Sequence, residues 1–188
     1  MAEIQIFSDI SFSLYNAWIL AIPSWILGII VSRTNKKSFK RATDISWYKT
    51  RDKVFSFGGM TLMMVFMILS LYIPIITDSL WFIIGLILFT IGFICHNISK
   101  VHYMKAEPKK VIQNGFYQYS RNPNYFFFAL ILLGVTLTAQ SFVLLALWLV
   151  IVVSNHIVIL GEERYCTIYY GEAYERYKKK VPRYFLFF

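Results

Sequence analysis

The chain has 188 residues, of which 57 % are hydrophobic and only 15 % are charged, and its formal net charge is +9 at pH 7. About a quarter of the residues in a soluble domain are charged, so this composition excludes an ordinary soluble domain and indicates a membrane protein. The basic residues flank long apolar runs, where attraction to anionic lipid head groups explains them more simply than nucleic acid does. We therefore expect anionic lipids, and no nucleic acid, at the basic face.

Five apolar stretches are predicted to cross the bilayer as helices of one all-α membrane domain, since about 20 apolar residues span the hydrocarbon core. They cover residues 12–32, 55–76, 80–97, 125–138 and 142–160. The last two belong to one long apolar run whose longest polar interruption lies at 136–141, which favours a tight hairpin. In the third stretch Gly85 and Gly92 share one helix face, and we expect that face to pack on a neighbouring helix.

The nineteen Lys and Arg residues all lie in three segments that these stretches separate: 33–53, 100–121 and 164–183. Five crossings put the three segments on one side of the membrane, which is the positive-inside pattern. Four crossings would put the last six basic residues on the opposite side. We therefore predict an outer N-terminus and a cytoplasmic C-terminus, with cytoplasmic segments at 33–54, 98–124 and 161–188.

Two of the cytoplasmic segments are expected to contain further helices. Trp47 and Tyr48 suit the membrane interface, so we predict a surface helix near residues 45–48. The tail from 162 to 177 is predicted to be helical with a break near Gly171.

Two polar constellations lie at the predicted cytoplasmic boundary. The first runs from Gly115 to Tyr125 and combines aromatic residues with Arg121 and two asparagines. It is typical of a membrane boundary, with a snorkelling Arg and a Pro at a helix start, and it equally suits the floor of a pocket for a flat ring. The second is Glu162-Glu163, directly after an apolar run, where the helix dipole disfavours anions. Two carboxylates there favour a cationic or hydroxyl-bearing partner.

Metal and soluble-nucleotide sites are not predicted. His96 and His102 lie close together, but no Asp, Glu or Cys joins them at a metal-ligand spacing. The sequence also lacks a Gly-rich phosphate loop and a Gly-x-Gly-x-x-Gly turn, so a nucleotide cofactor would not be held by a soluble nucleotide-binding fold.

Taken in order, several motifs resemble the isoprenylcysteine carboxyl methyltransferase family, which is related to the phospholipid methyltransferases. The motifs are Gly115-x-Tyr117-x-x-x-Arg121-x-Pro123-x-Tyr125, the apolar hairpin, Glu162-Glu163, Tyr170-Gly171-Glu-x-Tyr174-x-x-Tyr177 and Val181-Pro182-Arg183. They span nearly half of the chain. The sequence departs from the family pattern at three positions. Asn122 replaces a His, Phe127 replaces a Gly, and Val158 replaces an Arg that is expected to meet the carboxylate of a prenylcysteine.

The resemblance implies an S-adenosyl-L-methionine-dependent enzyme with its cofactor site at the cytoplasmic edge of the membrane. By position, the family's cofactor contacts fall on His102, Lys109, Lys110, Val111, Ile112, Tyr117, Asn122, Pro123, Asn124, Tyr125 and Glu162. The catalytic residues are expected to be Arg121 and Glu163. A lipophilic substrate, prenylated or lipid, would enter from the bilayer between the helices, with the fourth and fifth spans as its walls.

Three functions are weighed. The first is O-methylation of a prenylcysteine-like carboxylate, which is already ionised at pH 7 and needs no general base. Arg121 would orient this carboxylate, and Glu162 would hold the ribose or amino group of the cofactor. The second is N-methylation of a phospholipid amine, which needs a base, and His102 is the only nearby candidate. The third is a non-catalytic membrane scaffold or transporter subunit.

Overall fold

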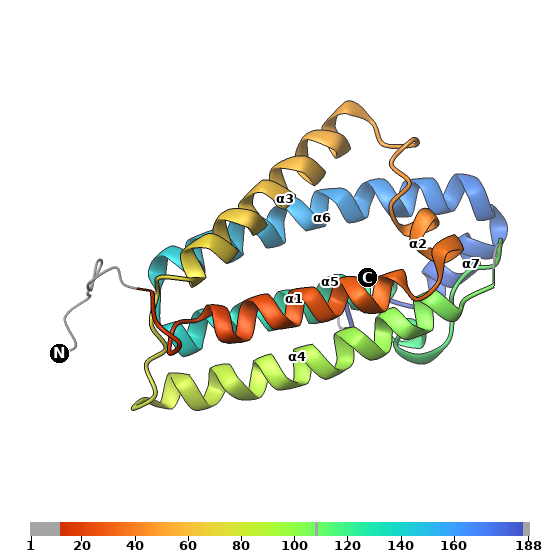
Figure 1. The fold of residues 1–188 in the computed structure, drawn as a ribbon. Coiled ribbons are helices and arrows are strands. Elements are labelled where there is room, and N and C mark those ends of the chain that lie inside the picture. The colour runs from red at the N-terminus through yellow and green to blue at the C-terminus, as the bar shows by residue number, and fades with distance from the viewer. Residues whose placement is uncertain (1–11, 108, 186–188) are drawn as a thin grey trace.

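The computed structural model describes residues 12–107 and 109–185, and this part of the chain is helical with no β-strand. The helices are α1 (Trp18–Arg33), α2 (Lys36–Ala42), α3 (Thr50–Ser70), α4 (Leu80–Lys105), the 3₁₀ helix η1 (Gly115–Gln118), α5 (Pro123–Ala139), α6 (Phe142–Tyr170) and α7 (Glu172–Lys180). α1, α3, α4, α5 and α6 form an elongated bundle (Figure 1). The short helices α2 and α7 lie at one end of it, next to the C-terminal end of α4.

Three of the described helices, α3, α4 and α6, are long and apolar enough to cross a membrane. α1 and α5 are apolar but shorter. Large hydrophobic side chains such as Ile87, Ile94 and Val153 are exposed on the bundle, as expected for a surface that faces lipid. The all-helical fold with membrane-spanning helices agrees with the sequence, while the number of five crossings stays a prediction.

Two helices extend beyond the ends predicted for their spans. α4 continues to Lys105 because residues 98–105 contain no Gly or Pro, and α6 continues to Tyr170 through Gly161, which lies inside the helix and packs closely on the carboxyl group of Asp52. Gly171, with a positive φ of 55°, ends α6, and α7 begins directly after it. The predicted helical tail with a break at Gly171 is therefore confirmed. The first part of this tail is a continuation of α6, so Glu162 and Glu163 both lie on one long helix.

The helix predicted near residues 45–48 is wrong. Residues 46 and 47 form a turn, where the Asp44 carboxylate accepts the Ser46 N–H, and the helix of this segment lies earlier, at α2. The side chain of Asn35 caps α2 by accepting from the backbone N–H groups of Lys37 and Ser38. The Asn35 cap therefore sets where the helix of this segment begins, whereas the aromatic residues Trp47 and Tyr48, on which the prediction relied, do not form a helix.

α4 and α5 approach each other through glycines. A Cβ on Gly134 would lie 2.5 Å from the backbone nitrogen of Phe89, and one on Gly85 would lie 2.8 Å from the Gly134 oxygen. Gly92 meets the backbone of Ile131 in the same way, at 2.9 Å. The prediction that Gly85 and Gly92 form one packing face is thus confirmed, and the face belongs to a contact between two backbones.

Adding a single methyl group at this contact is expected to destabilise the protein. Gly134→Ala should lower the thermal unfolding temperature in detergent, because overpacking of a tight contact costs about 1–3 kcal/mol. Gly58→Ala on α3 is the matched control, since a Cβ there has no atom within 4 Å. Equal unfolding temperatures for the two variants would contradict this close approach.

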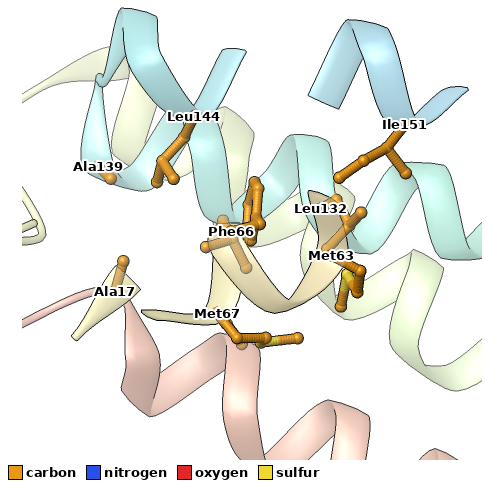
Figure 2. Close-up of a cluster of buried hydrophobic side chains, with 10 residues drawn as sticks. Ala17, Met63, Phe66, Met67, Leu132, Ala139, Leu144 and Ile151 are labelled. Carbon is orange, nitrogen blue, oxygen red and sulfur yellow. The ribbon is translucent and has the colours of Figure 1, made fainter. Parts of the chain in front are cut away.

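The buried apolar cluster occupies the end of the bundle near the α5–α6 hairpin. Its side chains come from α3, α5 and α6, with Ala17 before α1 and Ala21 within it (Figure 2). Phe66 and Leu144 are fully buried there. The basic segments lie at the opposite end, around α2, α7 and the C-terminal end of α4 (Figure 1). The bundle therefore has an apolar end and a basic end.

Candidate active site

The segment between α4 and α5 is fixed by the C-terminal tail. Gly115 has a φ of 58° and lies against the ring of His102, so a side chain at this position would overlap that ring. The hydroxyl of Tyr177 donates to the Tyr117 carbonyl at 2.6 Å. The Arg121 N–H donates to the Pro182 carbonyl at 2.9 Å. Two stretches that are far apart in the sequence are thus joined before α5 begins at Pro123.

Glu163 is the centre of a buried ionic cluster. Its Oε1 accepts from Arg121 Nε at 3.0 Å and from Asn122 Nδ2 at 3.1 Å, and its Oε2 accepts from Arg183 Nη2 at 2.9 Å. Arg121 Nη1 donates to the carbonyls of Lys178 and Val181, at 3.1 and 2.7 Å. The guanidinium of Arg121 is therefore directed at protein acceptors on α6, on α7 and just after α7.

Glu162 has a different environment, although it is the next residue. Its Oε1 accepts from the hydroxyl of Tyr125 at 2.7 Å and from that of Tyr48 at 3.4 Å. No ion pair with Glu162 occurs among the described residues. Burial, and after it the nearby Glu162 carboxylate, raises the pKa of the Tyr48 hydroxyl well above its usual range, so Tyr48 stays a donor. Glu162 is thus a partly buried carboxylate that is held by hydroxyls and not neutralised by a cation.

An aromatic cavity of about 170 Å³ lies between the α4–α5 segment, α6 and α7. Its lining includes Trp47, Tyr103, Tyr117, Tyr125, Tyr165, Tyr170, Tyr174 and Tyr177, together with Val111, Ile112, Asn122, Asn124, Cys166 and the cluster of Arg121, Glu162 and Glu163. The ring of Trp47 stacks on that of Tyr165 with centroids 4.5 Å apart. Burial raises the pKa of Tyr174 and Tyr177, whose hydroxyls therefore stay protonated. Flat rings and hydroxyls surround a carboxylate in this cavity.

A second cavity of about 370 Å³ lies toward the interior of the bundle, between α1, α4, α5 and α6. Its lining is apolar at Trp25, Phe128 and Ile131, and polar at positions such as His96 and Lys100. The two cavities share four lining residues: Tyr103, Asn124, Tyr125 and Glu162. We call these four residues the partition, because both cavities border on them.

The side chains predicted for the site are mostly brought together. Val111, Ile112, Tyr117, Asn122, Asn124, Tyr125 and Glu162, as well as Arg121 and Glu163, all line the aromatic cavity. Lys109 and Lys110 line a neighbouring pocket with Val111 and Tyr170. Pro123 is buried at the start of α5. His102 lies behind Gly115 and does not line either cavity, and its Nδ1 is buried without a partner among the described residues.

Several lining residues were not predicted from the sequence. Tyr174 and Tyr177 lie three residues apart on α7 and share one of its faces, and this spacing was the available signal, whereas Tyr170 is the last residue of α6. Trp47 and Tyr103 lie far from the motifs along the chain, and no local pattern identifies them. They reach the cavity only through tertiary packing: Trp47 stacks on Tyr165 of α6, and Tyr103 lies on α4, which packs against α5.

A family model described as phospholipid methyltransferase matches residues 75–173 of this chain. The matched residues include α4, α5, α6 and the segment that carries Tyr117 and Arg121, so they hold most of both cavities. No curated protein and no solved structure matches the chain significantly.

Proposed function

The chain belongs to the phospholipid methyltransferase family and is an integral membrane protein, and on this premise we propose that it methylates a lipophilic substrate with S-adenosyl-L-methionine as donor. This family and the isoprenylcysteine carboxyl methyltransferases belong to one superfamily of membrane methyltransferases. The observation that carries the proposal is the partition of Tyr103, Asn124, Tyr125 and Glu162. It lets two reactants approach each other from two cavities of different character.

The aromatic cavity fits the chemistry of the methyl donor. S-adenosyl-L-methionine supplies an electrophilic methyl group on a sulfonium cation, next to an adenine ring and a ribose. Tyrosine and tryptophan faces attract a cation and stack on a flat ring. The Glu162 carboxylate can accept hydrogen bonds from hydroxyl or amino groups. Asn124 Oδ1 is buried without a partner among the described residues, so it offers another acceptor to a ligand.

The second cavity suits the acceptor. Its apolar side, with Trp25, Phe128 and Ile131, can take the start of a lipid chain. The polar group of the lipid would then meet the partition, where Tyr125 and Glu162 lie. The protein would hold the two reacting groups in line and exclude water from them, and positioning of this kind accounts for much of the rate of a displacement.

An amine is favoured over a carboxylate as the acceptor. Arg121, which was expected to orient a substrate carboxylate, is bound to Glu163 and to two backbone carbonyls. Glu162 would repel a second carboxylate, whereas it attracts an ammonium group. It can also take a proton from this ammonium, and the free amine nitrogen then bonds to the methyl carbon as the carbon–sulfur bond breaks. His102, the base expected from the sequence, lies behind Gly115 and outside the cavities.

Carboxyl O-methylation of a prenylcysteine is the second candidate, since the ordered motifs resemble that branch of the superfamily. A direct comparison separates the two. We expect the purified protein to transfer a labelled methyl group to phosphatidylethanolamine faster than to farnesylcysteine. Transfer to farnesylcysteine alone would reverse the choice of acceptor.

Binding of the demethylated donor tests the enzyme class itself. Calorimetric titration of the detergent-solubilised protein with S-adenosylhomocysteine should give saturable binding, and Tyr174→Ala, which removes an aromatic wall, should weaken it. Glu172→Gln on the exposed surface of α7 serves as the control. Absence of binding would favour a scaffold or transporter subunit instead.

We also propose that the end of the bundle with α2 and α7 faces the cytoplasm. The basic residues gather there, and anionic lipids of the inner leaflet attract them (Figure 1). In this orientation the N-terminus is outside and the aromatic cavity faces the compartment that holds the soluble methyl donor.

A further inference from the structure

Lys100 is a cation that turns into the bundle. It lies on α4, and its Nζ donates to the Gly28 carbonyl on α1 at 3.0 Å. A lysine that merely snorkels would direct its ammonium outward to lipid phosphates. Here the ammonium lies against the backbone of the neighbouring helix α1 and lines the second cavity. Ionisable residues inside a membrane bundle usually serve a ligand or a partner.

The surface of α1 leaves room for this side chain. A Cβ on Gly28 would lie 2.9 Å from Lys100 Nζ, so the absence of a side chain at this position makes the contact possible. Ser24 and Ser32 lie one turn on either side of Gly28 and line the same cavity. Ser32 Oγ donates to the Gly28 carbonyl at 2.7 Å, so this carbonyl already has a second donor. An ammonium has three hydrogens, and the structure records a protein acceptor for one of them.

The charges of the cavity stand on different helices. Lys100 on α4 is the one lysine among the described residues that line it, and Glu162 on α6 is the one acidic residue. Polar side chains without a formal charge, such as Asn155, and apolar ones, such as Phe128 and Ile131, make up the rest of the lining. An amphiphile with an anionic group and a neighbouring amine is complementary to both charges and to the apolar surface.

From this arrangement we propose that Lys100 binds the anionic oxygens of the lipid substrate's head group, either a phosphodiester or a carboxylate. Lys100 would thereby select acceptors that carry an anion and would position them so that the reacting group meets the partition. The identification of this ligand as the substrate rests on the proposed function, while the binding itself can be measured without the methyl donor.

The test is calorimetric titration of the full-length protein in detergent with four lipids. They are a short-chain phosphatidylethanolamine, the diacylglycerol with the same chains, farnesylcysteine, and its methyl ester. Lys100→Met should weaken binding of the phosphodiester or the free carboxylate by at least about tenfold, as expected for one charge-assisted hydrogen bond. Binding of the neutral lipids should not change. The lipid whose affinity falls identifies the source of the anion.

Two further variants separate charge from structure. Lys100→Gln keeps an N–H donor for the Gly28 carbonyl but loses the charge, so it should bind lipid as weakly as Lys100→Met. Lys105→Met removes an exposed lysine of the same helix and should leave binding unchanged. Wild-type affinity in Lys100→Gln, or equal binding of anionic and neutral lipids by the natural protein, would overturn the proposal. S-adenosylhomocysteine binding is a separate measurement, so the proposed function stands or fails independently.

Discussion

Replacing Glu162 by Gln is expected to lower the turnover of an amine acceptor by a factor of about 10²–10⁴, the range that general-base catalysis contributes. The amide oxygen of Gln can still accept the hydrogen bond of the Tyr125 hydroxyl, so the fold should survive. The amide cannot take a proton, however, and the acceptor amine must lose one. Single-turnover methyl transfer with saturating lipid measures the chemical step directly.

The pH dependence separates a base from a binding group. Without Glu162 the amine must deprotonate before it attacks, and the neutral fraction of an amine grows as pH rises. The rate of Glu162→Gln should therefore increase with pH and approach that of the natural protein under alkaline conditions. Glu175→Gln on exposed α7 should match the natural protein at every pH. If Glu162→Gln shows an equal loss at every pH, the carboxylate binds a reactant and is not the base.

Replacing Glu163 by Ala is expected to cost about 3–5 kcal/mol of unfolding free energy, as does breaking a buried ion pair from one side. The cost is high because two cations lose their partner: the guanidinium groups of Arg121 and Arg183 both donate N–H hydrogen bonds to the Glu163 carboxylate. Without it, two cations face each other at the joint between α6 and the tail. The aromatic cavity should open at the same time, so S-adenosylhomocysteine binding should weaken.

Denaturant or thermal unfolding in detergent measures this cost, and two comparisons define its origin. Glu172→Ala breaks the exposed pair with Arg176, which should be worth about 0–1 kcal/mol. The double replacement Arg121→Met with Glu163→Leu removes a charge together with its partner, so it should be less damaging than Glu163→Ala alone. A Glu163→Ala variant as stable as Glu172→Ala would show that the cluster is not a structural joint.

The sequence was sufficient to predict features that depend on local patterns. Apolar runs identified the long helices, the seven-residue spacing of Gly85 and Gly92 identified a packing face, and Gly171 marked the end of a helix. The pairing of the Gly115–Tyr125 segment with Glu162 followed from the resemblance to a family, because nothing in the spacing of the residues requires it. The hydrogen bond from Tyr125 to Glu162 now provides that contact.

The different environments of the two glutamates could not be predicted. Glu162 and Glu163 are chemically identical neighbours, and a turn of about 100° along the helix separates their side chains. One meets two hydroxyls and the other two guanidiniums, and these partners come from three segments that are far apart in the sequence. For the same reason the contacts of Arg121 with Glu163 and with the Val181 carbonyl were not predicted, since a backbone carbonyl has no sequence signature.

The partition has a consequence for inhibition. Because Tyr103, Asn124, Tyr125 and Glu162 line both the aromatic cavity and the second cavity, a single synthetic compound can address both. A nucleoside joined through a short tether to an alkyl tail would gain affinity from each half at once. Neither the nucleoside nor the alkyl tail would need to bind tightly by itself. The tether length that gives the highest affinity would measure the distance between the two binding sites.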